Sequence, residues 1–335
     1  MWHRRALRFL SGSNLLSKVG MTAGVATSAV IMADGVNTAL RTDLVETFLN
    51  LERLDTNLFR AHHLLSGVKQ SQIVYGGQVI GQALQAASAT VDSIYSPHSL
   101  YCFFIDHGKT TQPILYSVER IRDGRSYQNR HVKAIQNGNA ILTAEVSFHK
   151  SEPDSIAHQA RMPTVPPPDN LADAQTVLTN AANDPNITES RRNFLAFRAS
   201  NVTSTFEMRP CDPEQYSNTR ADEPKLACWV KTNGNIGDDM RLHHCAAGFI
   251  SDVSMISAAI LPHITAGFRV GMVTSLSHCM WIHRPTFRMD EWMLYETEST
   301  IAAGGRAMIF GRLWSRDGVL VMSTAQEALV RGPKL

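Results

Sequence analysis

An internal repeat is the feature that most constrains how this chain can fold. Four short segments of the first half recur in the second half, in the same order and 179 to 181 residues later. Chance rarely keeps one offset over four separate landmarks, so we expect two copies of one fold. The matched positions are His98-Ser99 with His278-Cys279, Tyr116 with Tyr295, Gly124-Arg125 with Gly305-Arg306, and Gly138 with Gly318.

Proline marks the middle of the chain. Nine of the fourteen prolines lie between Ser151 and Lys225, a density that opposes continuous helix or central strand. We therefore expect a proline-rich linker over 151–225. It would join an N-terminal copy at 43–150 to a C-terminal copy at 226–332.

Within each copy the pattern predicts a helix followed by antiparallel strands. Asn137-Gly138 and Asp317-Gly318 are two-residue hairpin signals between strand-like runs at 127–135, 140–148, 306–314 and 319–329. Apolar residues at helical spacing predict helices over 77–89 and 244–261. An antiparallel sheet wrapped around a helix is the hotdog architecture. The expected fold class is α+β, a double hotdog with two such units in one chain.

The predicted helix at 244–261 contains the first candidate site residue. Apolar side chains surround most of it, which is typical of a helix buried on most sides, yet Asp252 interrupts them. A carboxylate in such surroundings is unfavourable unless it is paired or hydrogen-bonded, and it therefore often marks a functional site. The alternative is that Asp252 bonds the backbone of a neighbouring loop.

Composition and missing motifs argue against several classes of protein. The net charge of +2 is too small for a protein that binds phosphate backbones, so no nucleic-acid partner is expected. Five widely spaced cysteines without a C-x-x-C pair predict neither a zinc site nor a redox disulfide. No G-x-S-x-G motif occurs, so a serine on a nucleophile elbow is not expected. No G-x-G-x-x-G or P-loop motif occurs either, so no nucleotide cofactor is expected. The weakly polar run 21–33 is shorter than the ~20 residues that cross a bilayer, so no integral membrane association is expected.

The two ends of the chain carry conflicting targeting signals. Residues 1–33 are basic, contain serines and lack acidic residues, like a mitochondrial transit peptide, within a leader or targeting segment expected at 1–42. Residues 333–335, Pro-Lys-Leu, differ from the peroxisomal Ser-Lys-Leu signal at one position. We expect the peroxisomal matrix and a peroxisomal import receptor as partner, with mitochondria as the alternative. A disordered leader and a chance tripeptide are the remaining interpretation.

Several blocks in order resemble the acyl-CoA thioesterase II family, particularly its peroxisomal eukaryotic members. The resemblance covers about residues 51–331. The blocks are Val74-Tyr75-Gly76-Gly77-Gln78-Val79-Ile80-Gly81-Gln82-Ala83-Leu84, Arg122-Asp123-Gly124-Arg125-Ser126-Tyr127, Ala134-Ile135-Gln136-Asn137-Gly138, Phe249-Ile250-Ser251-Asp252, His278-Cys279-Met280-Trp281-Ile282-His283-Arg284-Pro285 and Ser323-Thr324-Ala325-Gln326-Glu327.

The resemblance implies hydrolysis of fatty acyl-CoA to free acid and CoA, without a cofactor or covalent intermediate. It implies that Asp252, Ser275 and Gln326 hold the attacking water, in agreement with the choice of Asp252 from the residues alone. The family often has Asp-His-Ser where this chain has Ser277-His278-Cys279, so the adjacent Thr274 stays an alternative hydroxyl donor. Neighbours in a strand face opposite sides, so only one of the two hydroxyls should reach the water.

Substrate-binding residues are less strongly indicated. Gly77 or Gln78, at the start of the first helix, would offer a free backbone N–H to the thioester oxygen. The alternative is that the glycines only allow close packing. Arginine suits phosphate, so Arg122 and Arg125 are candidates for the CoA phosphates. Arg130, Arg284 and Arg306 are weaker candidates, and each arginine could equally be a solvated surface charge.

Two other functions stay open. One is a non-catalytic acyl-CoA binding protein, and the other is a different hotdog reaction such as enoyl-CoA hydration. The first copy has Glu145 and Gln85 where the second has Gln326 and Asp252, so we expect one active site per chain. The two-fold character of hotdog proteins predicts a homo-oligomer.

Overall fold

The structure is a computed structural model that describes residues 43–69, 71–220 and 223–333. The expected leader at 1–42 and the last two residues of the terminal tripeptide, Lys334 and Leu335, lie outside the described residues.

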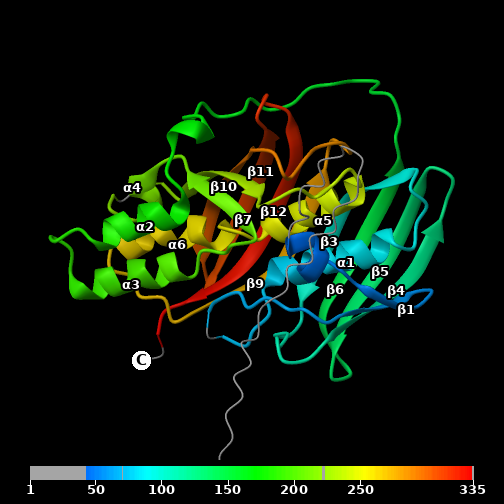
Figure 1. The fold of residues 1–335 in the computed structure, drawn as a ribbon, viewed down its shortest axis with the longest axis horizontal. Coiled ribbons are helices and arrows are strands. Elements are labelled where there is room, and N and C mark those ends of the chain that lie inside the picture. The colour runs from blue at the N-terminus through cyan, green and yellow to red at the C-terminus, as the bar shows by residue number, and fades with distance from the viewer. Residues whose placement is uncertain (1–42, 70, 221–222, 334–335) are drawn as a thin grey trace, which may run out of the picture. The chain divides into compact units, whose positions relative to one another are not determined.

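Twelve antiparallel strands form one continuous sheet, which confirms the predicted fold class (Figure 1). Their order across the sheet is β1-β2-β4-β5-β6-β3-β9-β12-β11-β10-β8-β7. The bounds are β1 Glu52–Asp55, β2 Leu58–Ala61, β3 Tyr95–Phe104, β4 Ile114–Asp123, β5 Tyr127–Gln136, β6 Asn139–Lys150, β7 Phe206–Pro210, β8 Lys225–Thr232, β9 Met272–Ile282, β10 Met293–Ala303, β11 Arg306–Ser315 and β12 Leu320–Arg331.

Strands β3 and β9 join the two copies. Ser99 lies opposite Trp281, and Tyr101 lies opposite Cys279. The repeat offset of 180 residues exchanges these two pairs, so a local two-fold axis passes between β3 and β9. The internal repeat of the sequence is therefore a structural repeat.

Helix α1, Gly76–Ser88, packs against the strands of the first copy, and α6, Met255–Thr265, packs against those of the second. The helix before α6, α5 at Met240–Ser251, contacts α1 across the junction of the two copies. Glycines allow the contact: a Cβ on Gly77 would lie 2.2 Å from the carbonyl oxygen of Phe249, and one on Gly81 would lie 2.9 Å from that of Cys245. The glycines thus allow close helix–helix packing.

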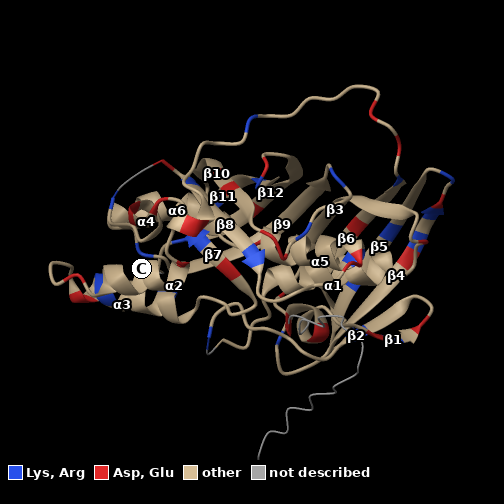
Figure 2. Ribbon diagram, turned by 45° about the horizontal axis from the view of Figure 1, so that its top comes forward, with Lys and Arg blue, Asp and Glu red and all other residues tan. Residues whose placement is uncertain are grey.

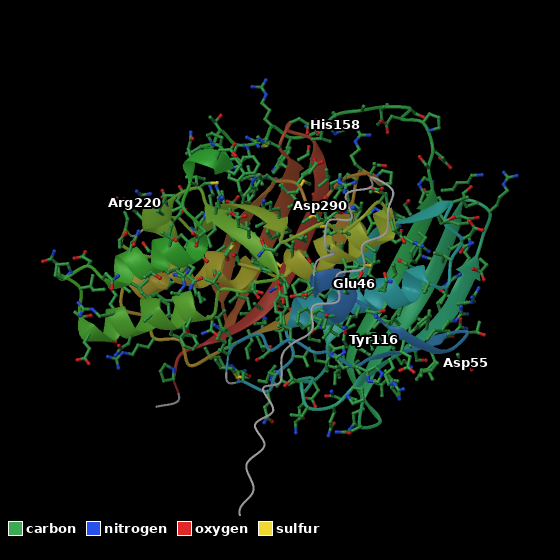
Figure 3. The ribbon with its side chains drawn as sticks, in the orientation of Figure 1. Glu46, Asp55, Tyr116, His158, Arg220 and Asp290 are labelled. Carbon is green, nitrogen blue, oxygen red and sulfur yellow. The ribbon has the colours of Figure 1, made fainter. Side chains whose placement is uncertain are left out.

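A buried hydrogen bond joins α1 to the sheet of the first copy. The hydroxyl of the buried Tyr116 on β4 donates to the side chain of Gln82 on α1 at 2.7 Å (Figure 3).

The single helix predicted over 244–261 is wrong. The chain forms α5 and then α6, Met255–Thr265, with a break at 252–254 where Ser254 adopts a left-handed φ of 64°. By length and composition alone, 240–265 is apolar enough to cross a membrane. In the fold it is interrupted and mostly buried, as the core helices of a double hotdog are.

The predicted linker contains helices and a strand. From Pro168 onward the chain forms a 3-10 turn, three α-helices and edge strand β7, whereas 151–167 contains neither helix nor strand. Prolines fall where they are tolerated, such as Pro213 in a first helical turn, and Asp173 and Thr188 cap two helices. The elements are η2 Pro168–Asn170, α2 Ala174–Ala182, α3 Glu189–Ser200 and α4 Pro213–Tyr216, and the first copy begins with η1, Leu44–Phe48.

Charge is mixed over the described surface. Figure 2 shows basic and acidic residues interspersed on the strands and helices of both copies. This distribution agrees with the small net charge of the whole sequence.

Candidate active site

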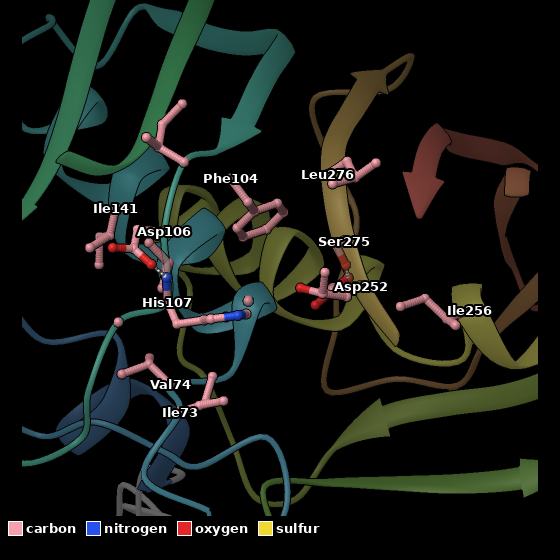
Figure 4. A pocket seen from close by; sticks show the side chains of 15 residues that line it. Ile73, Val74, Phe104, Asp106, His107, Ile141, Asp252, Ile256, Ser275 and Leu276 are labelled. Carbon is pink, nitrogen blue, oxygen red and sulfur yellow. Dashed lines mark hydrogen bonds between the residues drawn. The ribbon is translucent and has the colours of Figure 1, made fainter. Parts of the chain in front are cut away.

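A cavity of about 300 Å³ lies where the two copies meet, and both copies line it (Figure 4). The first copy contributes the start of α1 and the loop that follows β3, including His107. The second contributes Asp252, the start of α6 and one end of β9. The lining residues are Ile73, Val74, Gly76, Val79, Phe104, Ile105, Asp106, His107, Gly108, Ile141, Asp252, Ile256, Thr274, Ser275 and Leu276.

Asp252 is the residue directly after α5, not a residue within a helix as predicted. Its side chain is half-buried and lies at the start of α1, where a Cβ on Gly76 would be 2.8 Å from Oδ2. The first turn of a helix carries unpaired N–H groups and a partial positive charge, which favours a nearby carboxylate. The N-terminus of α1 therefore helps to hold the carboxylate of Asp252 in the cavity.

Ser275 donates a 3.1 Å hydrogen bond to Oδ1 of Asp252. A β-bulge orients it: Glu327 pairs with Ser277 and Ala328 pairs with Ser275, so Leu276 has no partner on β12. The extra residue shifts the alternation of side chains and brings Ser275 to the same face as Gln326. Thr274 also lines the cavity, but only the Ser275 hydroxyl bonds both Asp252 and Gln326.

Gln326 extends the hydrogen-bonded chain away from the carboxylate. Its Nε2 donates to the Ser275 hydroxyl at 3.0 Å, and its Oε1 lies 2.6 Å from Nδ1 of His278. Nε2 of His278 lies 2.9 Å from the hydroxyl of Ser251. Gln326, His278 and Ser251 are all fully buried. Burial lowers the pKa of His278, although the Asp252 charge opposes the shift.

Two tyrosines fix the end of α5 next to Asp252. The hydroxyl of Tyr75 donates to the carbonyl oxygen of Phe249 at 3.0 Å, and that of Tyr295 donates to the carbonyl oxygen of Ser251 at 2.6 Å. The last carbonyls of a helix lack partners within it, so these bonds hold the backbone that carries Asp252. Burial raises the pKa of both phenols, and the Asp252 charge adds to the rise.

The structure does not place Gly77 and Gln78 where the oxyanion prediction needs them. The backbone N–H of Gln78 donates to Tyr75, and its buried amide bonds the segment before α1 through Phe48, His63 and Leu65. Gly77 packs against α5. Neither lines the cavity, but Gly76 does.

The arginines predicted to bind CoA phosphates also lie outside the lining. Arg122 and Arg125 are exposed at the turn between β4 and β5. Arg130 is completely buried and donates to Thr90 and Asp123, so it stabilises the fold. In the other copy, Arg284 pairs with Asp154 and Arg306 pairs with Glu327.

The first copy uses its corresponding positions differently. Glu145 pairs with His131 at 2.5 Å on an exposed part of the sheet. Gln85 accepts a 3.1 Å hydrogen bond from the thiol of Cys245. Among the described residues of the first copy, these two side chains form no counterpart of the Asp252 network. The described residues also contain no cluster of three or more His, Cys, Asp or Glu arranged to hold a metal ion.

The sequence patterns do not identify the supporting residues of the site. His278 is a landmark of the repeat and belongs to a block that resembles the family, but neither pattern indicates its contact with Gln326. The helix predicted over 77–89 begins one residue after the start of α1 at Gly76. Tyr75 lies in a block that resembles the family and Tyr295 is a landmark of the repeat, but neither pattern indicates a hydrogen bond to the end of α5.

Comparison with known proteins adds independent information. Family models for the acyl-CoA thioesterase N-terminal and C-terminal domains match residues 66–149 and 169–330. The acyl-coenzyme A thioesterase 8 of Homo sapiens is 43% identical over 293 residues, which cover 87% of this chain and 90% of that protein. The acyl-CoA thioesterase 2 of Haemophilus influenzae is 34% identical, with 84% and 95% covered.

Solved structures agree. The acyl-CoA thioesterase II TesB2 of Mycobacterium marinum is 33% identical and superimposes with a TM-score of 0.69, over 87% of this chain and 99% of that one. The two domain models match in the order N-terminal, then C-terminal domain, and relatives above 30% identity match over most of their length. The chain belongs to the acyl-CoA thioesterase II family.

Proposed function

We propose that the protein hydrolyses fatty acyl-CoA thioesters to free acid and CoA with a water molecule activated by Asp252. The observation that carries the proposal is the hydrogen-bonded chain from Gln326 through Ser275 to Asp252, which ends at a cavity. Asp252 lies beside the start of a helix, where N–H groups can face a substrate oxygen. Membership of the family supports the same reaction.

Each polar group has a defined part in this mechanism. Asp252 accepts a proton from water as the water oxygen attacks the thioester carbonyl carbon. Ser275 orients the carboxylate and the water, and Gln326, which is buried behind Ser275, orients the Ser275 hydroxyl, so the reacting atoms meet in one geometry. The backbone N–H of Gly76, in the first turn of α1 and in the cavity lining, donates to the developing oxyanion. The carbon–sulfur bond then breaks, and CoA leaves as the thiolate, which takes up the proton.

The cavity walls fit an acyl chain. Val74, Val79 and Ile141 are nearly fully buried and line the side of the cavity that belongs to the first copy. Asp106 and His107 are exposed at its rim. We assign the buried wall to the acyl group and the rim to the CoA arm, because burial of apolar surface favours the hydrocarbon and water favours the polar arm.

The experiment is a panel of short-, medium- and long-chain acyl-CoAs assayed for release of free thiol, with an enoyl-CoA followed for loss of its conjugated double bond. Thiol release at catalytic turnover is the expected result. Tight binding of acyl-CoA without thiol release would favour the binding-protein alternative instead. Loss of the double bond without thiol release would favour hydration.

We also propose the peroxisomal matrix as the site of action. The peroxisomal acyl-coenzyme A thioester hydrolase 1 of Saccharomyces cerevisiae is a 23% identical relative over 85% of this chain, and residues 333–335 resemble a peroxisomal import signal. A reporter carrying the C-terminal residues should enter peroxisomes and should lose that location when Leu335 is deleted. Import into mitochondria directed by residues 1–42 would contradict the proposal.

A further inference from the structure

We propose that His278 is a positioning residue, which fixes the direction of the Gln326 amide and thereby commits the Ser275 hydroxyl to Asp252. The inference rests on the proposed hydrolysis and concerns the same site. It assigns a role to a side chain that touches neither the cavity nor Asp252.

The geometry places His278 between the two arms of the site. Its Nδ1 lies 2.6 Å from Oε1 of Gln326 on β12, and its Nε2 lies 2.9 Å from Oγ of Ser251, the last residue of α5. Ser251 precedes Asp252 directly. The imidazole therefore connects the strand that carries Gln326 to the helix end that carries Asp252.

A neutral imidazole has one donor nitrogen and one acceptor nitrogen, and complete burial favours the neutral form of this ring. With the proton on Nδ1, the ring donates to Oε1 of Gln326, and Nε2 shares the single Ser251 hydroxyl proton with the carbonyl oxygen of Gly248, which lies 2.8 Å from that hydroxyl. Gln326 then presents its N–H to Ser275, and the only proton of Ser275 goes to Asp252. The hydrogen bonds from His278 through Gln326 and Ser275 therefore all donate in one direction and end on the carboxylate of Asp252.

Without a hydrogen-bond donor at the position of the His278 Nδ1, the side-chain amide of Gln326 could adopt either of two orientations. A turned amide would present Oε1 to Ser275, and the Ser275 proton would then be drawn to Gln326 rather than to Asp252. The two directions use the same heavy-atom positions, so packing alone does not choose between them. A donor aimed at Oε1 does choose, and His278 supplies it.

His98 provides a comparison within the same chain. It occupies the position of His278 in the first copy, 180 residues earlier. There a β-bulge between Pro97 and Ser99 leaves His98 half-buried, with Nε2 2.8 Å from the hydroxyl of Ser147. In the second copy the bulge is at Leu276 instead, and the histidine faces the buried side. The copy that places its histidine inward is the copy that holds the Asp252 network.

Two nearly isosteric variants separate the functions of the two ring nitrogens. The amide of asparagine overlays Nδ1, so His278→Asn keeps a donor for Gln326. The amide of glutamine overlays Nε2, so His278→Gln keeps a partner for Ser251 and loses the donor. We expect His278→Gln to lower kcat about tenfold to a hundredfold with KM changed less than about twofold, and His278→Asn to stay within about threefold of the parent.

The matched controls are His98→Gln and His98→Asn, which should leave kcat within about twofold of the parent. Urea unfolding of each variant checks the fold. If His278→Gln does not fold, His278→Ala with and without added imidazole replaces it, and recovery of thiol release by imidazole is expected.

Provided that the parent releases thiol, any of three results would overturn the inference. These are a wild-type kcat in His278→Gln, an equal loss of kcat in both His278 variants at equal stability, and no recovery of His278→Ala with imidazole. A parent that releases no thiol would instead overturn the proposed function, and this inference with it.

Discussion

The hydroxyl of Ser275 reaches the carboxylate of Asp252, at 3.1 Å, from a strand that carries one extra residue. Leu276 has no partner on β12, and this bulge turns Ser275 toward the inside of the sheet. The hydroxyl thereby links Gln326 to Asp252, two residues that come from a strand and a helix end 74 positions apart in the sequence. The hydrogen-bonded arrangement of Asp252, Ser275 and Gln326 therefore depends on this bulge.

Removal of the Ser275 hydroxyl should slow hydrolysis without unfolding the protein. We expect Ser275→Ala to lower kcat about tenfold to a hundredfold, because Asp252 and Gln326 lose their common partner. Ser275→Thr keeps the hydroxyl and should keep most activity. Thr274→Ala should have the smaller effect of the two alanine variants, and a larger loss there than in Ser275→Ala would show that the wrong hydroxyl has been assigned. Thiol release under saturating acyl-CoA measures all three.

A methyl group on Gly76 should damage the site while the fold survives. The added Cβ would lie 2.8 Å from Oδ2 of Asp252 and 3.1 Å from the ring of Phe104, so the carboxylate must move. Displacement by about 1 Å can lower a rate about a hundredfold, and we expect a loss of kcat of that order in Gly76→Ala. Parallel measurements of kcat and of urea unfolding make the check. Normal turnover in this variant would contradict the close approach of the Asp252 carboxylate to Gly76.

The contact between α1 and α5 should tolerate a methyl group at one glycine and not at another. Gly77→Ala would bring Cβ to 2.2 Å from a backbone carbonyl, so the helices must separate, and we expect the free energy of unfolding to fall by about 1–3 kcal/mol or more. In Gly248→Ala the nearest atom is 3.5 Å away, and alanine is favoured over glycine in a helix by up to about 1 kcal/mol. Urea unfolding distinguishes them, and equal stability of both variants would contradict this description of the contact.

Acid should destabilise the fold through a buried histidine outside the site. His244 is 1% exposed, its Nε2 lies 2.7 Å from the carbonyl oxygen of Pro285, and burial lowers its pKa to about 4. An unfolded histidine titrates near 6.5, so the unfolded state takes up the proton first and stability is lost as the pH falls from about 6.5 toward 4. At about pH 5 the loss from this one group is about 2 kcal/mol.

The measurement is urea unfolding of the parent and of His244→Gln near pH 7.5 and near pH 5. The parent should lose about 2 kcal/mol more than the variant on acidification. An identical loss in the two proteins would assign the acid sensitivity to other groups.

The repeat in the sequence allowed the double sheet to be predicted, because matched hairpin signals and an equal offset constrain both copies at once. The break after Asp252 could not be predicted from the same pattern. The apolar run continues through it, and the residue that adopts the left-handed conformation is Ser254, which carries no turn signal of the kind that glycine or asparagine gives. The folded part of the predicted linker was missed because prolines at the first turn of a helix and at a strand end do not interrupt those elements.

Of the proposed site, the resemblance and the carboxylate in an apolar run both point to Asp252, and the structure joins Ser275 and Gln326 to it by hydrogen bonds. Local sequence does not reveal that Gln78 holds the segment before α1 by hydrogen bonds, or that Arg130 on β5 is completely buried. Those facts depend on contacts between distant segments. The same holds for His278, whose partners Ser251 and Gln326 come from two other elements.

The most direct test of the central claim compares the parent with Asp252→Asn in a single-turnover assay of acyl-CoA hydrolysis. Binding of a thioether analogue that cannot be hydrolysed is measured beside it. Asparagine keeps the size of the side chain but cannot take the proton of water. We predict thiol release slower by a factor of about a thousand, with affinity for the analogue unchanged within a few-fold. Hydrolysis by Asp252→Asn within about threefold of the parent rate would contradict the account.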